Sequence, residues 1–204
     1  MFTVVVASQK GGAGKSTLAR NLAVAAGAGA ALVDTDPQGS LTDWWNRREA
    51  EAPALARLDG DMAAGLAALA EGGVKLVLVD TPPSVHPWLS DLLRLADLVL
   101  IPVRPSPDDL AAVGGTLDLV EAAGRPFAFV VSQAKPGTIL AREAVPALAQ
   151  YGRVAPVIIH DRVEFPTAAI DGRGVTERDG PGAEEVRQLL HYVMTQLRKG
   201  AKKP

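Results

Sequence analysis

A glycine-rich segment near the N-terminus, Ser8 to Thr17 (SQKGGAGKST), has the residue types and spacing needed to bind phosphate groups. Glycine adopts backbone angles that other residues resist, so successive N–H groups of such a loop can turn inward around phosphate oxygens. Lys15 is placed to reach the β and γ phosphates, and the Ser16 hydroxyl to hold Mg²⁺. The sequence therefore predicts a phosphate-binding loop with the nucleotide-binding residues Gly11, Gly12, Ala13, Gly14, Lys15, Ser16 and Thr17.

The segments on either side of this loop agree with the prediction. An apolar run of strand length, Phe2 to Ala7, precedes the loop, and leucine and alanine recur at helical spacing from Thr17 to Ala28. This order of strand, loop and helix places the positive end of a helix dipole beside the bound phosphates.

A second apolar run ends in an acidic residue. Lys75 to Val79 (KLVLV) predicts a buried strand, and Asp80 follows at its carboxyl end. Ligands bind at the carboxyl edge of open parallel sheets. Asp80 is therefore placed to hold the water shell of a magnesium ion bound to the phosphates.

The loop departs from the general phosphate-binding motif at its first position, where Gln9 stands in place of glycine and is followed by a second lysine, Lys10. KGGAGKST resembles the deviant Walker A motif of the ParA/MinD family of ATPases. The resemblance implies that ATP and Mg²⁺ are bound between the two subunits of a homodimer, where Lys10 reaches the partner subunit's phosphates. It also implies that Lys10 and Lys15 are catalytic.

Two further segments resemble motifs of the same family. DTDPQGS, which begins at Asp34, resembles the Walker A′ or switch I segment, and VLVDTPPS around Asp80 resembles the Walker B and switch II segment. These resemblances imply that Asp36 is catalytic, because it orients or deprotonates the attacking water, and that Ser40 lies near the metal. The metal site that they imply consists of Ser16, Asp36 and Asp80.

Apolar runs continue to alternate with helical patterns along the chain. Leu98 to Val103, Pro126 to Val131 and Val154 to Ile159 have the composition of buried strands, and the pattern from Leu110 to Ala123 predicts a helix between them. This alternation indicates an α/β fold with a doubly wound, mostly parallel sheet and helices on both faces. With the phosphate-binding loop, it is the fold class of P-loop NTPases.

Composition limits the class of protein. The 204-residue chain is 48% hydrophobic and contains no cysteine, so it has material for one large core but none for disulfides, thiolate metal sites or iron–sulfur clusters. It has no signal peptide and no apolar run of membrane length, so we expect a cytoplasmic protein. We expect a single domain over residues 1–199 and a basic C-terminal tail over residues 200–204.

The charge is unevenly distributed, with a net −4 for residues 1–141 and +2 for residues 142–204. Ala183 to Leu197 predicts a last amphipathic helix, and the basic residues after it lack the apolar anchors with which MinD-type relatives bind membranes. The resemblance therefore favours the nucleoid-associated branch of the family, with non-specific DNA binding and no stable membrane association. The candidate DNA contacts are Arg187, Arg198, Lys199, Lys202 and Lys203.

Other positions match the family less closely. Relatives commonly carry asparagine after the sixth strand to read the adenine edge, whereas this chain has Gln133, which we expect to substitute for it. Arg162 and Glu177 fall at two further family positions, where a structural role is an alternative to a functional one.

The resemblance implies an ATPase that dimerises with ATP, binds DNA in that state, and partitions or positions a plasmid, a chromosome or other cellular cargo. A ParB-type or adaptor protein would stimulate hydrolysis. Two alternatives use the same motifs: a MinD-like or scaffold-type ATPase that positions a protein cluster without a DNA cargo, and a metabolic phosphotransferase.

Overall fold

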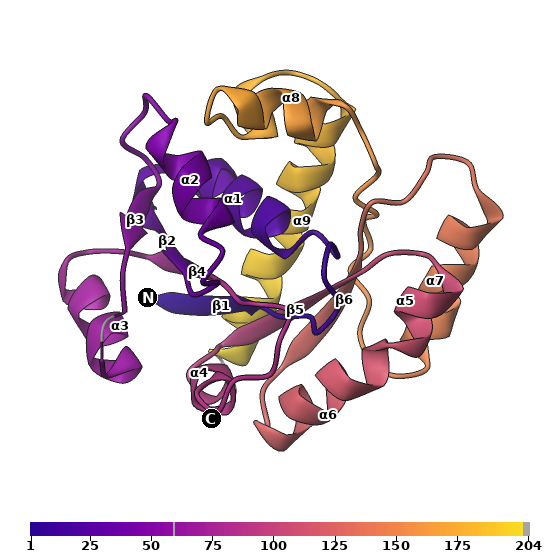
Figure 1. Cartoon of the computed structure of the whole chain (residues 1–204), viewed down its shortest axis with the longest axis horizontal. Helices are drawn as coiled ribbons and strands as arrows, with labels where there is room; N and C mark the ends of the chain where they lie inside the picture. The colour runs from indigo at the N-terminus through magenta and orange to yellow at the C-terminus, as the bar shows by residue number, and fades with distance from the viewer. Residues whose placement is uncertain (59, 202–204) are drawn as a thin grey trace.

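The centre of the molecule is a sheet in which every neighbouring pair of strands is parallel. The computed structural model describes residues 1–58 and 60–201, and within them the sheet has six strands in the order β3-β2-β4-β1-β5-β6 (Figure 1). The strands are β1 (Phe2–Val6), β2 (Ala30–Asp34), β3 (Ala54–Ala56), β4 (Leu76–Asp80), β5 (Leu98–Val103) and β6 (Phe127–Val131). The predicted doubly wound parallel sheet is confirmed.

Helices cover both faces of this sheet (Figure 1). On one face lie α1 (Lys15–Ala26), α2 (Ser40–Asn46), α8 (Glu164–Ile170) and α9 (Pro181–Gly200), with the short 3₁₀ turns η1 (Gly27–Gly29) and η2 (Val175–Glu177). On the other face lie α3 (Met62–Glu71), α4 (Leu89–Arg94), α5 (Pro107–Ala111), α6 (Val113–Ala122) and α7 (Ile139–Ala149). Among the described residues, no helix is both long enough and apolar enough to cross a membrane.

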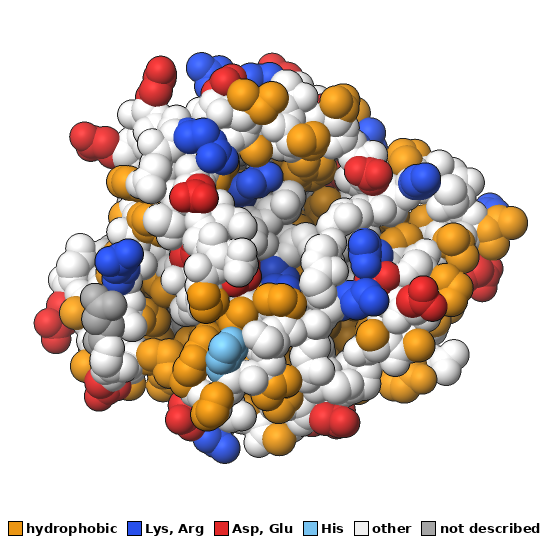
Figure 2. All heavy atoms as spheres, in the orientation of Figure 1, with side chains coloured by type: hydrophobic (Ala, Val, Ile, Leu, Met, Phe, Trp, Pro, Cys, Tyr) orange, Lys and Arg blue, Asp and Glu red, His pale blue; other side chains and the backbone are white. Residues whose placement is uncertain are grey.

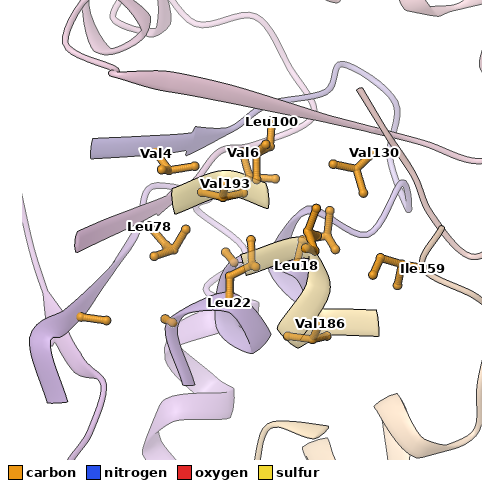
Figure 3. Packing of buried hydrophobic residues seen from close by; sticks show 14 of the residues in the cluster. Val4, Val6, Leu18, Leu22, Leu78, Leu100, Val130, Ile159, Val186 and Val193 are labelled. Atoms are coloured by element: carbon orange, nitrogen blue, oxygen red, sulfur yellow. The ribbon is translucent and has the colours of Figure 1, made fainter. Parts of the chain in front are cut away.

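Alternate residues of each central strand enter two separate cores. In β1, Val4 and Val6 pack with Leu22 of α1 and Val193 of α9 (Figure 3). Val5 faces the opposite core. All five of these side chains are fully buried. A strand covered on both faces has no solvent-facing side, which explains the near-continuous apolar runs in the sequence.

The strand predicted over Val154 to Ile159 is not formed. Only isolated bridges pair this part of the chain with its neighbours, at Val154 and His160. Pro156 lies in the middle of the segment and has no N–H group to donate to a ladder. The segment still runs beside β6, where the Ile159 N–H donates to the Val131 carbonyl over 2.9 Å.

The helices predicted from Leu110 to Ala123 and from Ala183 to Leu197 have different bounds in the structure. The helix expected from Leu110 to Ala123 is divided at Ala112 into α5 and α6. Ser106 caps α5 by accepting a hydrogen bond from the Asp109 N–H, as expected for this proline-containing turn. The last helix, α9, extends through Gly200, so the first residue of the predicted tail belongs to this helix. Residues 202–204 lie outside the described part of the chain.

Candidate nucleotide-binding site

The phosphate loop lies where the chain changes direction across the sheet. From β1 the chain passes through α1 to β2 on one side, whereas from β4 it crosses β1 to reach β5 on the other. The register aligns Asp80 with Val6 on one side and with Asp34 on the other. The loop and both acidic strand ends therefore meet at the carboxyl edge, as the sequence predicts.

The loop ends in a glycine that makes a tight entry into α1. Gly14 has a φ of 94° and precedes the first helical residue, Lys15. Within the described chain no side chain caps this helix start. The first N–H groups of α1 are consequently available to an anion, which also interacts favourably with the helix dipole.

Residues just after β6 and the backbone of α6 hold the loop from outside. The Ser132 hydroxyl donates to the Ala13 carbonyl and the Gln133 side-chain amide donates to the Gly12 carbonyl, both over 2.7 Å. Gln9 donates from its side chain to the Gly115 carbonyl over 2.8 Å. The Gln9 N–H donates to the Thr116 hydroxyl and the Lys10 N–H to the Ser8 hydroxyl. The N–H groups of Gly11 to Gly14 make no hydrogen bond with the described residues, so they stay available to a ligand.

Gln133 has a contact that its predicted role did not include. Its backbone φ of 52° is unusual for a residue with a side chain, and its amide nitrogen lies against Gly14 as well as the Gly12 carbonyl. Adenine reading by Gln133 stays a prediction; in this structure the amide supports the loop.

The two loop lysines have different environments. Lys15 is buried, with 6% of its surface exposed, and its ammonium donates to the Lys10 carbonyl over 3.4 Å. Burial lowers the pKa of Lys15, while the negative charges of Asp80 and Asp36 act in the opposite direction. Lys10 is partly exposed, and its ammonium makes no hydrogen bond or ion pair with any described residue.

Asp80 is buried without a hydrogen-bond partner for either carboxylate oxygen among the described residues. Burial raises the pKa of Asp80 to about 7, although the neighbouring Ser16 hydroxyl and Lys15 favour the ionised form. An uncompensated buried carboxylate is costly unless a cation or donor completes it. Magnesium bound through one or two carboxylates, water and substrate phosphates fits this environment, and Ser16 and Asp80 are the protein groups that would hold it.

The two aspartates of the DTD segment have different partners. Asp34 accepts hydrogen bonds from the Thr42 N–H at 2.8 Å and the Thr42 hydroxyl at 2.9 Å, which ties the end of β2 to α2. Asp36 accepts one from the Gln38 N–H at 3.0 Å. Asp34 is thus engaged in holding α2, whereas Asp36 lies near enough to Lys15 to act on its pKa. Its catalytic and metal-binding roles stay predictions.

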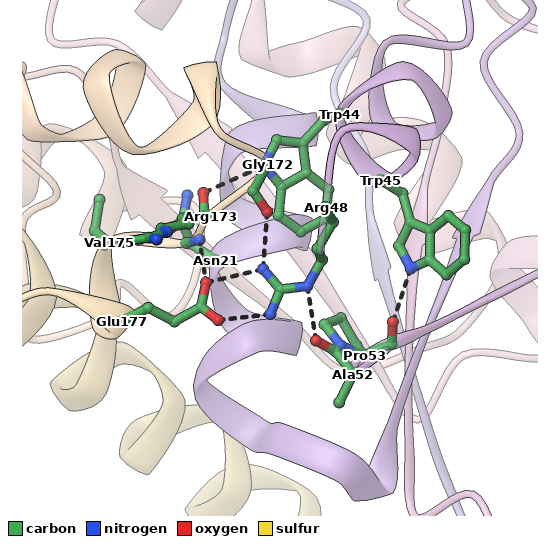
Figure 4. Close-up of polar contacts among 11 residues, drawn as sticks. Asn21, Trp44, Trp45, Arg48, Ala52, Pro53, Gly172, Arg173, Val175 and Glu177 are labelled. Atoms are coloured by element: carbon green, nitrogen blue, oxygen red, sulfur yellow. Dashed lines mark hydrogen bonds and ion pairs between the residues drawn. The ribbon is translucent and has the colours of Figure 1, made fainter. Parts of the chain in front are cut away.

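Arg48 joins α2 to the segment before α9 (Figure 4). Its guanidinium donates to both carboxylate oxygens of Glu177, at 2.6 and 2.8 Å, and to the carbonyls of Ala52 and Gly172. Trp44 packs within 5.4 Å of this guanidinium and is fully buried, whereas Trp45 is only partly buried. Glu177 therefore has a structural role here.

Arg162 is likewise engaged in an ion pair, since it donates twice to Glu185 of α9, at 2.7 and 2.9 Å. A cavity of about 180 Å³ lies between this pair and the phosphate loop. Its walls include Gly14, Thr17, Arg20, Gln133, Ile159, His160, Arg162, Phe165 and Pro166. Polar groups such as Thr17, Gln133 and Arg162 together with the apolar surface of Ile159, Phe165 and Pro166 suit a nucleoside attached to phosphate.

The candidate DNA contacts do not lie beside the phosphate loop. Arg198 and Lys199 are exposed in the last turn of α9, and Lys199 lines a second cavity, of about 520 Å³, with Arg125 and Arg153 at the opposite edge of the sheet. Arg187 is exposed on the same helix. Lys202 and Lys203 lie outside the described residues. On the face shown in Figure 2, basic and acidic side chains are interspersed.

Several residues that shape the site were missed in the sequence. The Thr35 hydroxyl donates to the Asp80 carbonyl over 2.6 Å and the Thr81 hydroxyl to the Val6 carbonyl over 2.9 Å, so both fasten adjacent strand ends. Ser132 supports the loop, and Arg20 lines the nucleoside cavity. Thr35, Thr81 and Ser132 follow or end predicted strands, and this position at the carboxyl edge could have indicated their roles. Nothing in the sequence around Arg20 indicates its position in the cavity.

Without nucleotide and metal, the stability of the protein is expected to fall as the pH rises from 3.8, the ordinary pKa of Asp80, to its raised value of about 7. Below this window the folded and unfolded states are both protonated; within it the unfolded chain releases the proton first, which favours unfolding. Above about pH 7 the carboxylate is ionised in both states, so the free-energy cost of burying it no longer changes with pH. Thermal unfolding of wild type and Asp80→Asn should diverge through this window, and parallel pH profiles would contradict the burial of an uncompensated carboxylate.

Comparisons with known proteins agree with this geometry. The profile of the CobQ/CobB/MinD/ParA nucleotide binding domain matches residues 4–175. Maintenance of carboxysome distribution protein A of Halothiobacillus neapolitanus is 33% identical over 211 residues, which cover 95% of this chain and 96% of that protein. The chromosome-partitioning ATPase Soj of Thermus thermophilus is 30% identical over 241 residues and 96% of each chain.

A solved structure extends the likeness to the fold. Cobyrinic acid a,c-diamide synthase from Mycobacterium smegmatis, with a bound ATP analogue and magnesium, matches 100% of this chain and 98% of its own, with a TM-score of 0.77 and 18% sequence identity. At this level of identity, the likeness concerns the fold alone.

Proposed function

The chain belongs to the CobQ/CobB/MinD/ParA nucleotide binding domain family, and we propose that it is an ATPase that positions cellular cargo through ATP-dependent dimerisation and DNA binding. The observation that carries the proposal is the meeting of Lys15, Asp36 and Asp80 around an uncapped helix start, with Lys10 unengaged beside them. The ATP analogue and magnesium in the Mycobacterium smegmatis synthase support ATP and Mg²⁺ as the ligands.

Each residue has a defined task in this proposal. The N–H groups of the loop and the Lys15 ammonium bind phosphate oxygens, and their positions are set before binding, so little reorganisation is needed. Ser16 and Asp80 hold Mg²⁺, which neutralises phosphate charge. Asp36 orients or deprotonates the water that attacks the terminal phosphate. Lys10 extends from its own subunit to the phosphates of the partner.

Dimerisation couples the nucleotide to DNA. The net charge of −2 and the short basic stretch at Arg198 and Lys199 give one subunit only a weak basic patch. Two linked copies of a weak patch bind more tightly than one, because the second contact becomes intramolecular. Hydrolysis removes the group that the two subunits share, so the dimer separates and leaves the DNA.

Two relatives support different kinds of cargo. Similarity to the carboxysome distribution protein supports a protein assembly as the cargo, whereas similarity to Soj supports a chromosome. We favour a protein assembly moved along non-specific DNA by means of an adaptor that stimulates hydrolysis. A positioning ATPase that acts without DNA would show no nucleotide-dependent binding to duplex DNA. The same holds for a phosphotransferase.

Asp36→Ala is expected to test this function. The variant should still bind ATP and dimerise. It should hydrolyse ATP at least about a hundredfold more slowly, because a positioned acid–base group contributes about that much or more. It should therefore stay on DNA longer than wild type. Phosphate release, light scattering and dissociation from random-sequence duplex DNA measure these properties. Asp43→Ala is the matched control, because it removes a carboxylate of the neighbouring helix α2.

Two results would change the assignment. If Asp36→Ala lost ATP binding, Asp36 would be a structural residue of the site. If wild-type protein bound duplex DNA equally with ATP, with ADP and without nucleotide, the proposed switch would be wrong.

A further inference from the structure

Arg20 is a positively charged residue in the nucleoside cavity that none of the sequence motifs includes. It lies on α1, three residues after Thr17 and four after Ser16, and lines the same cavity as Gly14 and Thr17. Its Nε atom is buried and has no hydrogen-bond partner among the described residues. A buried donor of a charged group without a partner is costly, and such a cost is relieved when a ligand supplies the acceptor.

No residue in the described part of the chain supplies an acceptor to the Arg20 Nε atom. Its guanidinium lies 5.9 Å from the centre of the Trp44 ring, a contact that attracts the cation but accepts no hydrogen bond. Burial lowers the pKa of Arg20, the positive charge of Arg47 lowers it further, and Asp80 acts in the opposite direction. Arginine stays protonated at all ordinary pH values. Arg20 therefore keeps its positive charge here, although it forms no ion pair with a described residue.

Helix geometry determines where the side chain points. Residues three and four positions apart share one face of a helix, and side chains point back toward its N-terminus. Arg20 therefore points from the second turn of α1 toward the turn that carries Ser16 and Thr17. The same cavity is lined by Gly14 and Thr17 and by Ile159, Phe165 and Pro166. Arg20 therefore shares one cavity with groups expected to face the phosphates and groups expected to face the base.

We propose that Arg20 binds the α-phosphate of the nucleotide and supplies a charge-assisted hydrogen bond in addition to the contacts of Lys15. The inference rests on the proposed nucleotide site and adds a residue to it. The α-phosphate carries negatively charged oxygens next to the ribose. Such an oxygen is a suitable acceptor for the unpartnered Nε–H group of Arg20. Arg20 then also connects the nucleotide to Trp44 and thereby to α2.

Arg20→Met tests this proposal, since methionine keeps an unbranched apolar stem but removes the charge. Calorimetric titration with ADP and Mg²⁺ should show binding weaker by about tenfold to a hundredfold, the loss expected for one charge-assisted hydrogen bond. Displacement of a fluorescent ADP analogue by AMP should show a similar loss, because AMP retains the α-phosphate. Arg125→Met, which removes an exposed arginine at the opposite edge of the sheet, should bind both ligands as wild type does.

Stability without nucleotide separates binding from structure. Because Arg20 is uncompensated in the empty site, Arg20→Met should unfold at the wild-type temperature or above it, while the increase in unfolding temperature on adding ADP becomes smaller. Arg20→Lys keeps the charge and should recover part of the affinity. A lower unfolding temperature of Arg20→Met without nucleotide, together with unchanged ADP affinity, would make Arg20 a structural partner of Trp44 and overturn the proposal.

The result for AMP tests the assignment to the α-phosphate. Weaker ADP binding with unchanged AMP displacement would overturn that assignment and move the contact to the β-phosphate. If wild-type protein itself bound no ADP, the proposed nucleotide function would fail, an outcome distinct from failure of the Arg20 contact alone.

Discussion

Lys15→Ala is expected to abolish ATP binding and, with it, ATP-dependent dimerisation. Lys15 is the buried cation of the loop, and its ammonium reaches only a backbone carbonyl in the empty site. The phosphates of ATP would be bound beside Asp36 and Asp80, whose negative charges repel them once this cation is removed. Calorimetry should show ATP affinity reduced by at least about a hundredfold, since charge-assisted contacts to several oxygens are lost together.

The control for this variant is Lys75→Ala, which removes an exposed lysine at the amino edge of the sheet beside Gly29. It should bind ATP and dimerise as wild type does. Lys15→Ala should retain the wild-type circular dichroism spectrum, because a buried ammonium without a carboxylate partner contributes little to folding. Wild-type ATP affinity in Lys15→Ala would contradict the assignment of the loop.

The sheet and the loop were predictable because each depends on local sequence. Buried strands such as β4 are continuous apolar runs, and Gly14 precedes Lys15 where the chain needs a positive φ before a helix. The segment from Val154 to Ile159 has the same apolar composition, yet Pro156 prevents a regular ladder. Composition alone overestimated that strand, whereas attention to the missing N–H group would have corrected it.

The supports of the site were harder to predict because their partners are distant in sequence. Ser132 and Gln133 bind loop carbonyls 119 and 121 residues away, and Arg48 binds Glu177 at a separation of 129 residues. No period or motif encodes such pairs. Arg20 is the extreme case, because its proposed role depends on a hydrogen-bond acceptor that residues 1–58 and 60–201 do not supply.

The position of the basic residues restricts how nucleotide can control DNA binding. Arg198 and Lys199 lie at the end of α9, at the edge of the sheet opposite to the phosphate loop. A phosphate bound at the loop does not contact these residues, so in the proposed function nucleotide acts on DNA affinity through the assembly of subunits. Lys10 is the residue on which that assembly is proposed to depend.

Lys10→Ala is expected to separate nucleotide binding from dimerisation. Lys15 already serves the loop, and the Lys10 ammonium has no partner among the described residues of its own subunit. The variant should therefore keep ADP and ATP affinity within about tenfold of wild type, which corresponds to the loss of no more than about 1.4 kcal/mol. It should fail to dimerise with ATP, as measured by light scattering, whereas Lys135→Ala, which removes an exposed lysine outside the loop, should dimerise normally.

DNA binding should change together with dimerisation. The logarithm of the affinity for duplex DNA falls linearly with the logarithm of the salt concentration, and the slope is proportional to the number of phosphates contacted. Halving the basic contacts should therefore roughly halve this slope. Shift assays at several salt concentrations should give Lys10→Ala with ATP the shallow slope of wild-type monomer without nucleotide. A Lys10→Ala protein that still dimerised with ATP would remove Lys10 from the subunit interface. Loss of DNA binding in such a dimer would instead place Lys10 among the DNA contacts.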